Sequence, residues 1–176
     1  MVTRDQFAQW IDAYHPALYR HALWMLGETE LAADLVQETY YQAWKGRAGL
    51  RDASKAYSWL LAILRRGAFQ EYGRAGRRRT GLRELGMRQA QVSAGDTAAL
   101  LDLADAFRCL TPNHRDLLLL SVLHGMSYAE IGAMLNIPTG TVMSRLSRAR
   151  AELARALAQT EPSGGKIVPL PMTRIR

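Results

Sequence analysis

Hydrophobic residues recur at intervals of three and four positions along most of this chain, and strictly alternating apolar and polar residues are scarce. The first spacing is typical of an amphipathic helix and the second of a strand, so the pattern predicts an all-α protein. The clearest stretch is residues 127–157, where two apolar-patterned segments flank Asn136 and Pro138. Asparagine tolerates the left-handed conformation that ends a helix, and proline cannot extend one. We therefore expect two helices joined by a tight turn.

The first of these helices begins with a capping box. Ser127 can accept a hydrogen bond from a free backbone N–H of the first turn, and Glu130, three positions later, can reach back to the cap. The second helix carries an apolar stripe that would face the rest of its domain. That stripe consists of Val142, Leu146, Ala149 and Leu153.

The opposite face of the second helix carries hydroxyl and guanidinium groups near the helix start. These groups belong to Thr141, Ser144, Arg145, Ser147 and Arg148. Arginine can bind guanine bidentately in the major groove, and small hydroxyl residues can contact bases or phosphates. A solvated basic face is the alternative, but the capped helix and turn that precede it favour a DNA-reading helix-turn-helix.

Capping and breaking residues predict further helices on the N-terminal side. Thr111 followed by Pro112 begins a helix, because proline fits the first helical position. Pro16 should interrupt the apolar pattern near the N-terminus and separate two helices. Two more helices are expected over about residues 30–46 and 54–72.

Charge is distributed unevenly along a chain whose net charge is +7. Residues 1–73 hold eight basic and eight acidic residues, whereas residues 74–97 hold six arginines and two acids. Glycines interrupt this basic segment, so it suits phosphate contacts as well as a solvated linker, and both can hold. We expect two small helical domains joined by a flexible basic linker.

An acidic face is predicted on the helix over residues 30–46. Asp34 and Glu38 stand four positions apart with Gln37 beside them, and no cation lies within a turn of either acid in the sequence. Like charges at that spacing repel by a few tenths of a kcal/mol. The arrangement indicates a basic partner, with a solvated face as the alternative.

The following helix mixes aromatic and basic side chains. Trp59, Leu60 and Ile63 are expected in the core. Arg65 and Arg66, together with exposed rings, could hold a separated DNA strand by phosphate attraction and base stacking.

Other residue types exclude several classes of function. Cys109 is the single cysteine, and its apolar neighbours predict a buried, inert thiol. The histidines lack metal-ligand spacing and are expected at the surface or core edge; they are His15, His21, His114 and His124. There is no glycine-rich phosphate loop, nucleophile motif, signal segment or apolar run near the roughly 20 residues of a membrane span. We expect a cytoplasmic protein with no enzymatic activity, metal, cofactor or small-molecule substrate.

Together these motifs resemble bacterial sigma factors of the extracytoplasmic-function (ECF) group. The resemblance covers about residues 5–158 in order. It rests on residues 34–40, Ala43 with Trp44, Trp59 with Leu60 and Ile63, residues 110–112, 125–131 and 138–142, and residues 144–146.

The resemblance implies a different role for each part of the chain. Residues 1–74 would bind the clamp helices of RNA polymerase and read the minus-ten promoter element. Residues 75–99 would be a flexible linker. Residues 100–159 would read the minus-thirty-five element and contact the polymerase flap. Residues 160–176 are basic and rich in proline and glycine, and we expect a disordered tail.

The resemblance also implies roles for particular residues. Asp34, Gln37 and Glu38 match the face that docks on core RNA polymerase, and residues 49–55 fall where the family captures a flipped base. The chain has Arg66 and Gln70 where the family commonly has Asn and Asp, and Met143 where a basic residue is common. With the charge pattern, the candidate DNA-binding residues are Arg51, Ser54, Lys55, Arg65, Arg66, Arg74, Arg77, Arg78, Thr141, Ser144, Arg145 and Arg148.

The expected function is that of an alternative sigma factor, which lends core RNA polymerase its promoter specificity. By the same resemblance, an anti-sigma factor, often membrane-anchored, would hold the chain inactive. Two alternatives remain from the sequence. A stand-alone helix-turn-helix regulator would not need the acidic face of Asp34 and Glu38. A decoy that titrates an anti-sigma protein would not need the arginines of the recognition helix.

Overall fold

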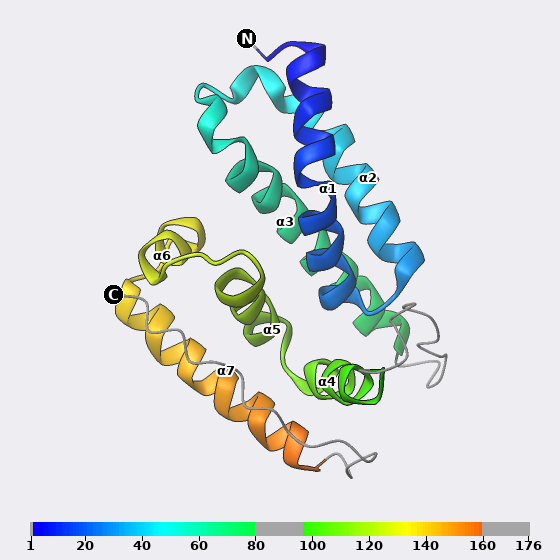
Figure 1. Ribbon diagram of the computed structural model, residues 1–176, viewed down its shortest axis with the longest axis vertical. Helices are drawn as coiled ribbons and strands as arrows, with labels where there is room; N and C mark the ends of the chain where they lie inside the picture. The colour runs from blue at the N-terminus through cyan, green and yellow to red at the C-terminus, as the bar shows by residue number, and fades with distance from the viewer. Residues whose placement is uncertain (1, 80–96, 160–176) are drawn as a thin grey trace.

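A computed structural model of the protein describes residues 2–79 and 97–159, with side chains described at 2–74 and 100–159. Throughout these ranges every regular element is helical (Figure 1), so the predicted all-α class is confirmed. The helices form two bundles: α1 to α3 make the N-terminal bundle and α4 to α7 the C-terminal bundle. Most of the proposed linker and the whole proposed tail, residues 80–96 and 160–176, lie outside the described residues.

The N-terminal bundle consists of α1 (Arg4–Leu26), α2 (Thr29–Gly46) and α3 (Ala56–Arg79), each packed against the other two. Two short 3-10 turns, η1 (Arg47–Gly49) and η2 (Ala53–Lys55), connect α2 to α3. Thr3 caps α1 by accepting a hydrogen bond from the backbone N–H of Gln6 at 3.2 Å. The fully buried side chains of the N-terminal bundle include Leu18, Met25, Val36, Leu60, Leu61 and Leu64.

The break expected at Pro16 does not occur, and that prediction is wrong. Pro16 lies inside the continuous helix α1. Proline removes one backbone hydrogen bond from a helix interior, at a cost of about 3 kcal/mol. Burial of Phe7 and Trp10 before it and of Leu18 and Ala22 after it holds both halves of α1 on the same core, which offsets that cost.

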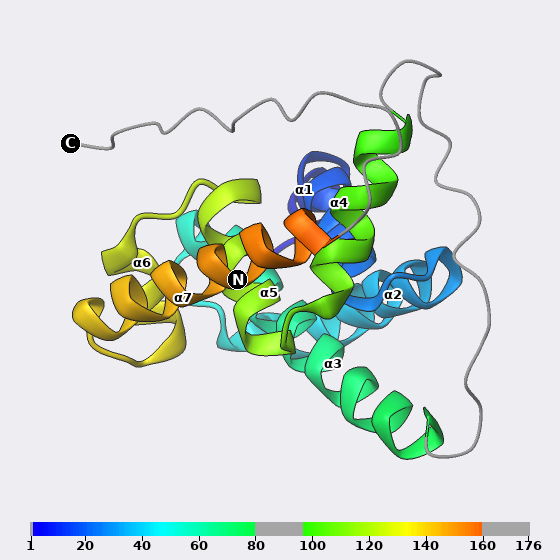
Figure 2. The same ribbon diagram turned by 90° about the horizontal axis from the view of Figure 1, so that it is seen from below.

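The C-terminal bundle consists of α4 (Thr97–Cys109), α5 (Pro112–Leu118), α6 (Tyr128–Leu135) and α7 (Thr139–Gln159). The long helix α7 packs against the other three (Figure 2) through the predicted stripe, all of which is buried. Thr111 caps α5 as expected, since its hydroxyl accepts a hydrogen bond from the backbone N–H of His114 at 3.3 Å. After α5 the chain makes a π-helical turn, η3 (Leu119–Leu123), in which the N–H of His124 donates to the carbonyl of Leu119 at 3.1 Å.

Helices α6 and α7 form the predicted helix-turn-helix. The Ser127 hydroxyl accepts from the Glu130 N–H at 3.3 Å, and the Glu130 carboxylate accepts from the Ser127 N–H at 2.8 Å, so the capping box is confirmed. Asn136 ends α6 in the left-handed conformation, at φ 53°. Gly132 lies against the turn, where a Cβ atom would meet the carbonyl oxygen of Ile137 at 2.9 Å.

The two bundles pack against each other where α1 and α3 meet α5 and η3. Trp24 of α1 and Phe107 of α4 make an edge-to-face ring contact with centroids 5.1 Å apart. Arg115 of α5 donates to the carbonyl of Met25, in the last turn of α1, at 2.6 Å. A cation at this end of a helix also complements the helix dipole.

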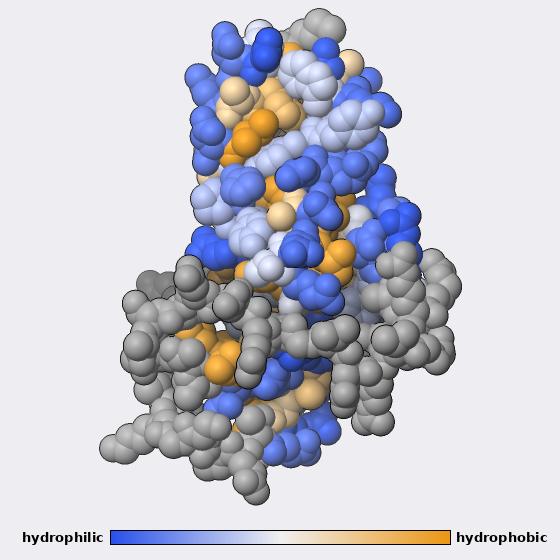
Figure 3. All heavy atoms as spheres, turned by 90° about the vertical axis from the view of Figure 1, so that its right-hand side faces the viewer, coloured by the Kyte–Doolittle hydropathy of each residue, from blue (hydrophilic) through white to orange (hydrophobic). Residues whose placement is uncertain are grey.

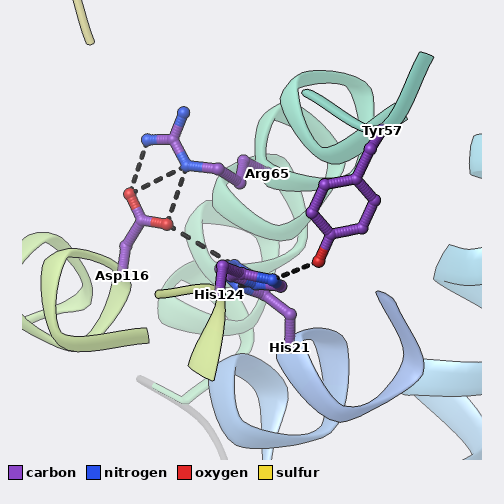
Figure 4. A network of polar contacts seen from close by, with 5 residues as sticks. All are labelled: His21, Tyr57, Arg65, Asp116 and His124. Carbon is purple, nitrogen blue, oxygen red and sulfur yellow. Dashed lines mark hydrogen bonds and ion pairs between the residues drawn. The ribbon is translucent and has the colours of Figure 1, made fainter. Parts of the chain in front are cut away.

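A chain of polar side chains crosses the same interface (Figure 4). Asp116 of α5 accepts hydrogen bonds from both Nε and Nη2 of Arg65 on α3, at 2.5 to 3.0 Å. Nε2 of His21 lies 3.4 Å from the same carboxylate. Nδ1 of His21 pairs with Nε2 of His124 at 2.9 Å, and Nδ1 of His124 pairs with the Tyr57 hydroxyl. We call these five residues the interbundle network.

Two predictions about isolated residues are wrong. His21 was expected at the surface or core edge but is fully buried in the interbundle network. Its burial depends on a partner about 100 positions later in the chain, which local sequence does not specify. Cys109 was expected to be buried, yet this last residue of α4 is exposed, because its neighbours Phe107 of α4 and Leu110 just after the helix are buried instead.

Substitution of Gly132 by alanine should lower the free energy of unfolding by about 1 to 3 kcal/mol, because the added methyl group overlaps a backbone carbonyl that cannot move freely. Chemical denaturation measures the change. The control is Gly140→Ala, where a Cβ atom meets nothing within 4 Å. Equal stability of the two variants would show that the turn does not require glycine.

Acid should weaken the packing of the two bundles. Burial lowers the pKa of His124 to about 4, and the neighbouring His21 acts in the same direction. A histidine whose pKa falls on folding stabilises the fold fully above its unfolded pKa of about 6.5, and that stability is lost as the pH falls toward 4. The charged or titratable groups around it come from α1, α3 and α5 and are Arg20, His21, Tyr57, Arg65 and Asp116.

The midpoint of thermal unfolding should therefore fall between pH 7 and pH 5 by more in the wild type than in His124→Gln, which cannot take up a proton there. Asp116 adds little in this window. Burial would raise its pKa, but the hydrogen bonds from Arg65 and His21 lower it on balance. Equal losses in the two proteins would contradict a titrating His124.

Candidate polymerase-docking and nucleic-acid surfaces

The outer face of α2 presents the predicted acidic residues to solvent. Asp34, Gln37 and Glu38 are all exposed, and Tyr41 continues the same face with 56% of its surface exposed. Across the described residues, neither Asp34 nor Glu38 takes part in an ion pair; Glu38 accepts only from the Gln42 amide, at 2.5 Å. We call Asp34, Gln37, Glu38 and Tyr41 the acidic stripe.

The acidic stripe owes its exposure to the residues behind it. Leu35, Val36 and Ala43 are buried against α1 and α3. Thr39 is buried as well, and its hydroxyl is satisfied by the carbonyl of Leu35 at 2.8 Å. Sequence reasoning missed Tyr41, although its position seven residues after Asp34 on an amphipathic helix is the signal that could have found it.

A groove of about 470 Å³ lies between α2 and α3, directly beside the acidic stripe. Leu35, Thr39 and Ile63 contribute to its lining, together with the backbone at Gly67. Polar and aromatic side chains of both helices complete it, namely Glu38, Gln42, Trp59, Arg66 and Gln70. Both residues at which the chain departs from the common ECF pattern on α3, Arg66 and Gln70, therefore line one groove.

The loop between α2 and α3 holds three of the predicted DNA-binding residues, Arg51, Ser54 and Lys55, and all are exposed. Asp52 accepts from the Ser54 backbone N–H at 2.9 Å and from its hydroxyl at 2.7 Å, and these hydrogen bonds lower the pKa of Asp52. The hydroxyl of Ser54 is thus oriented by its neighbour, while the two cations extend into solvent.

The predicted arginines of α3 fall into different environments. Arg66 is exposed beside the groove, and Arg74 is exposed but paired with Glu71 at 2.5 Å. Arg65 has a side chain only 12% exposed and is bound to Asp116. Arg77 and Arg78 belong to the last turns of α3, and their side chains lie outside the described part of the structure.

The recognition helix presents its predicted residues at the N-terminal end of α7. Ser144, Arg145 and Arg148 are exposed and Thr141 is half-buried. The Ser144 hydroxyl donates to the carbonyl of Thr141 at 3.0 Å. Met143 lies among them with 53% of its surface exposed, so this end of α7 mixes cations, hydroxyls and one thioether.

The predicted residues therefore make separate surfaces. The acidic stripe, the groove and the α2–α3 loop belong to the N-terminal bundle, and the exposed end of α7 belongs to the C-terminal bundle. On the side of the molecule that Figure 3 shows, the described residues are largely hydrophilic, with smaller apolar patches among them. Among the described helices, none is long and apolar enough to cross a membrane.

Comparison with protein families matches both bundles. Residues 10–78 match Sigma-70 region 2, and residues 100–153 match Sigma-70 region 4. The first match covers most of α1, all of α2 and nearly all of α3, and the second includes α6 and the greater part of α7.

Curated relatives span most of the chain. The ECF RNA polymerase sigma factor SigC of Mycobacterium tuberculosis is 34% identical and is matched over 78% of this chain and 74% of its own length. SigL of the same species is 32% identical over 84% and 86%. SigW of Bacillus subtilis, also an ECF sigma factor, is 28% identical over 88% and 90%.

Solved structures agree. The sigma factor RpoE of Bartonella quintana, in complex with the anti-sigma factor NepR, superposes with a TM-score of 0.73 at 28% identity, covering 90% of this chain and 100% of that one. CnrH, in complex with the cytosolic domain of CnrY, has the same fold, with a TM-score of 0.67 at 24% identity and coverages of 88% and 89%. With sigma regions 2 and 4 in order, a capped helix-turn-helix and relatives of this similarity, the chain belongs to the ECF group of RNA polymerase sigma factors.

Proposed function

We propose that this ECF sigma factor binds core RNA polymerase through the acidic stripe of α2 and reads promoter DNA with two separate surfaces. The observation that carries the docking face is the exposure of two carboxylates without ion-pair partners among the described residues. A basic partner that approached this face would interact favourably with both carboxylates. Tyr41 adds a large aromatic surface of the kind enriched at protein interfaces.

In this proposal residues 1–74 form the domain that docks on polymerase and reads the minus-ten element, residues 75–99 are a linker, and residues 100–159 read the minus-thirty-five element. Arg66 lines the α2–α3 groove, and Arg51 and Lys55 lie exposed on the loop between the same helices. All three would attract the phosphates of an opened strand. The protein would catalyse nothing itself and would act in the cytoplasm, where polymerase and promoter meet.

We also propose that an anti-sigma factor controls this chain. The support is the likeness to RpoE of Bartonella quintana, whose structure was solved in complex with the anti-sigma factor NepR. Such a partner would compete with polymerase for exposed faces of the two bundles. A membrane-anchored anti-sigma factor would then hold the chain at the membrane.

Reversing the acidic stripe should abolish docking. The double variant Asp34→Arg, Glu38→Arg should bind core RNA polymerase at least about a hundredfold more weakly than wild type, because like charges across an interface cost several kcal/mol. Co-elution with bacterial core polymerase on a sizing column, followed by titration, measures this. The control is Asp5→Arg, Asp12→Arg, which reverses two exposed acids on α1. Equal binding by both double variants would remove the acidic stripe from the docking face.

Arg145→Ala should weaken promoter-specific binding by about 1 to 3 kcal/mol while leaving polymerase binding unchanged, because one bidentate base contact is worth that much. Binding of the polymerase complex to promoter fragments with wild-type and altered minus-thirty-five elements measures it. Arg155→Ala is the control, on the exposed surface of the same helix about 15 Å further along. Unchanged discrimination in Arg145→Ala would exclude Arg145 from base readout.

A further inference from the structure

Met143 of α7 has a large apolar side chain that the fold does not bury. Its exposed fraction is 53%, whereas Val142 before it and Leu146 after it are fully buried and carry the contacts of this turn with the rest of the bundle. The stripe that packs α7 is therefore complete without Met143. A single exposed apolar residue is common on protein surfaces, so its role depends on what surrounds it.

The surroundings of Met143 suit a polyanion. Thr141, Ser144 and Arg145 lie within two positions of it. The whole of α7 holds four arginines and one acid, Glu152, which is paired with a histidine. A helix with this excess of positive charge attracts nucleic acid and repels a basic protein surface. The partner that best fits the side chains around Met143 is therefore DNA.

The turn before Met143 leaves its side chain accessible. Helical side chains tilt toward the N-terminus, so Met143 covers the first turn of α7 rather than the turn that follows. Gly140 occupies that first turn, and a Cβ atom there would meet nothing within 4 Å. In a helix-turn-helix this end of the second helix is the one that contacts base edges in the major groove. The thioether can therefore approach a base edge, with open space on the side of Gly140.

A thioether can recognise little on a base edge except a methyl group. Methionine has no hydrogen-bond donor, and its sulfur is only a weak acceptor. Of the groups that base pairs present in the major groove, the C5 methyl group of thymine is the apolar one.

The neighbours of Met143 are suited to other groups. Ser144 donates its hydroxyl proton to the carbonyl of Thr141 at 3.0 Å and so offers an acceptor to a base, whereas Arg145 offers only donors. Thr141 also carries a methyl group, but that residue is half-buried. Met143 is thus the exposed side chain at this end of α7 that is complementary to thymine.

We propose that Met143 contacts the C5 methyl group of a thymine in the minus-thirty-five element, and so makes the chain select thymine at one position. This contact deepens the proposed function and rests on it, because it forms only if α7 enters the major groove. ECF sigma factors commonly have a basic residue here, which offers donors to guanine or phosphate instead. A thioether in place of a cation changes the base that this position of the helix prefers.

Deoxyuridine is the probe for this contact, because it differs from thymidine only by the missing C5 methyl group. The full-length chain, bound to bacterial core RNA polymerase, first selects duplexes from a library randomised across both promoter elements. Each thymidine of the selected minus-thirty-five element is then replaced in turn by deoxyuridine, and the affinity is measured by titration. At one position the replacement should weaken binding about fourfold, the equivalent of one buried methyl group.

Variants at Met143 assign the methyl preference to this side chain. Met143→Ala should bind thymidine and deoxyuridine equally at that position, whereas Met143→Leu, which keeps an apolar side chain of similar size, should retain most of the preference. The matched control is Leu101→Ala, which shortens a side chain of similar exposure, 54%, on α4 and should keep the wild-type ratio. Circular dichroism confirms that each variant is folded.

Cytosine and 5-methylcytosine give the same comparison on a different base. The methyl group of 5-methylcytosine occupies the same ring position as that of thymine, so this pair tests the methyl group apart from the hydrogen-bonding pattern of the base. At the position found with deoxyuridine, wild type should bind 5-methylcytosine about fourfold better than cytosine. Met143→Ala should show no difference between the two.

Three results would overturn the contact. The first is a selected minus-thirty-five element that lacks thymine, or that binds equally well with deoxyuridine at every position. The second is a preference for thymidine that persists in Met143→Ala, since another residue such as Thr141 would then read the methyl group. The third is a Met143→Ala variant that binds core polymerase more weakly but keeps the wild-type preference, which would place the side chain in a protein interface.

The thymine contact and the proposed function fail differently. Loss of the proposed function would appear as wild-type protein that does not bind core polymerase, or as a complex that selects no sequence from the library. Loss of the thymine contact would appear as a complex that selects a minus-thirty-five element but does not distinguish thymidine from deoxyuridine through Met143.

Discussion

Asp116 is a carboxylate enclosed between two helical bundles, and a charge in such a place is stable only if other groups surround and neutralise it. The neighbouring helices meet that requirement with a bidentate arginine and a histidine, and the histidine is held in turn by a second histidine and a tyrosine. The positions of α1, α3 and α5 relative to one another are therefore constrained by a few polar contacts. Buried apolar side chains of both bundles belong to one cluster, and Trp24 meets Phe107 across the interface, so the polar contacts add directional constraints to an interface that is also apolar.

The surfaces assigned to polymerase and DNA are free of that constraint. The acidic stripe and the exposed end of α7 project from rigid helices whose opposite faces are buried. Their side chains can be tuned for a partner without disturbing the cores. Arg65 is the exception, because the guanidinium that we predict to contact DNA is bound to Asp116 where the bundles pack together. A substitution of Arg65 would therefore change the packing of the bundles as well as any contact with DNA.

Local chemistry made much of the fold predictable. The capping box of Ser127, the left-handed Asn136 and the Thr111 cap each depend on a few neighbouring residues, and the stripe of α7 follows from helical periodicity. Exposure of Asp34, Gln37 and Glu38 followed for the same reason. The predictions at Pro16 and Cys109 failed because packing against distant helices decided the outcome. It kept α1 continuous through Pro16, and it left the side chain of Cys109 exposed. The environments of His21 and Arg65 depend on partners 103 and 51 positions away in the chain, which local sequence does not specify. The α2–α3 groove could not be predicted for a similar reason, since it forms only where two helices pack side by side.

The π-helical turn after α5 has a consequence for how such an arrangement arises in evolution. The bond from His124 to Leu119 encloses one residue more than an α-helical turn would. Removing one residue from this turn would rotate everything after it by about 100° relative to α5. His124 would then face away from Tyr57 and His21 although every side chain of the network was retained. The ability of the two bundles to recognise each other is therefore encoded in the length of the helix as well as in its composition, and a single codon insertion or deletion could create or abolish it.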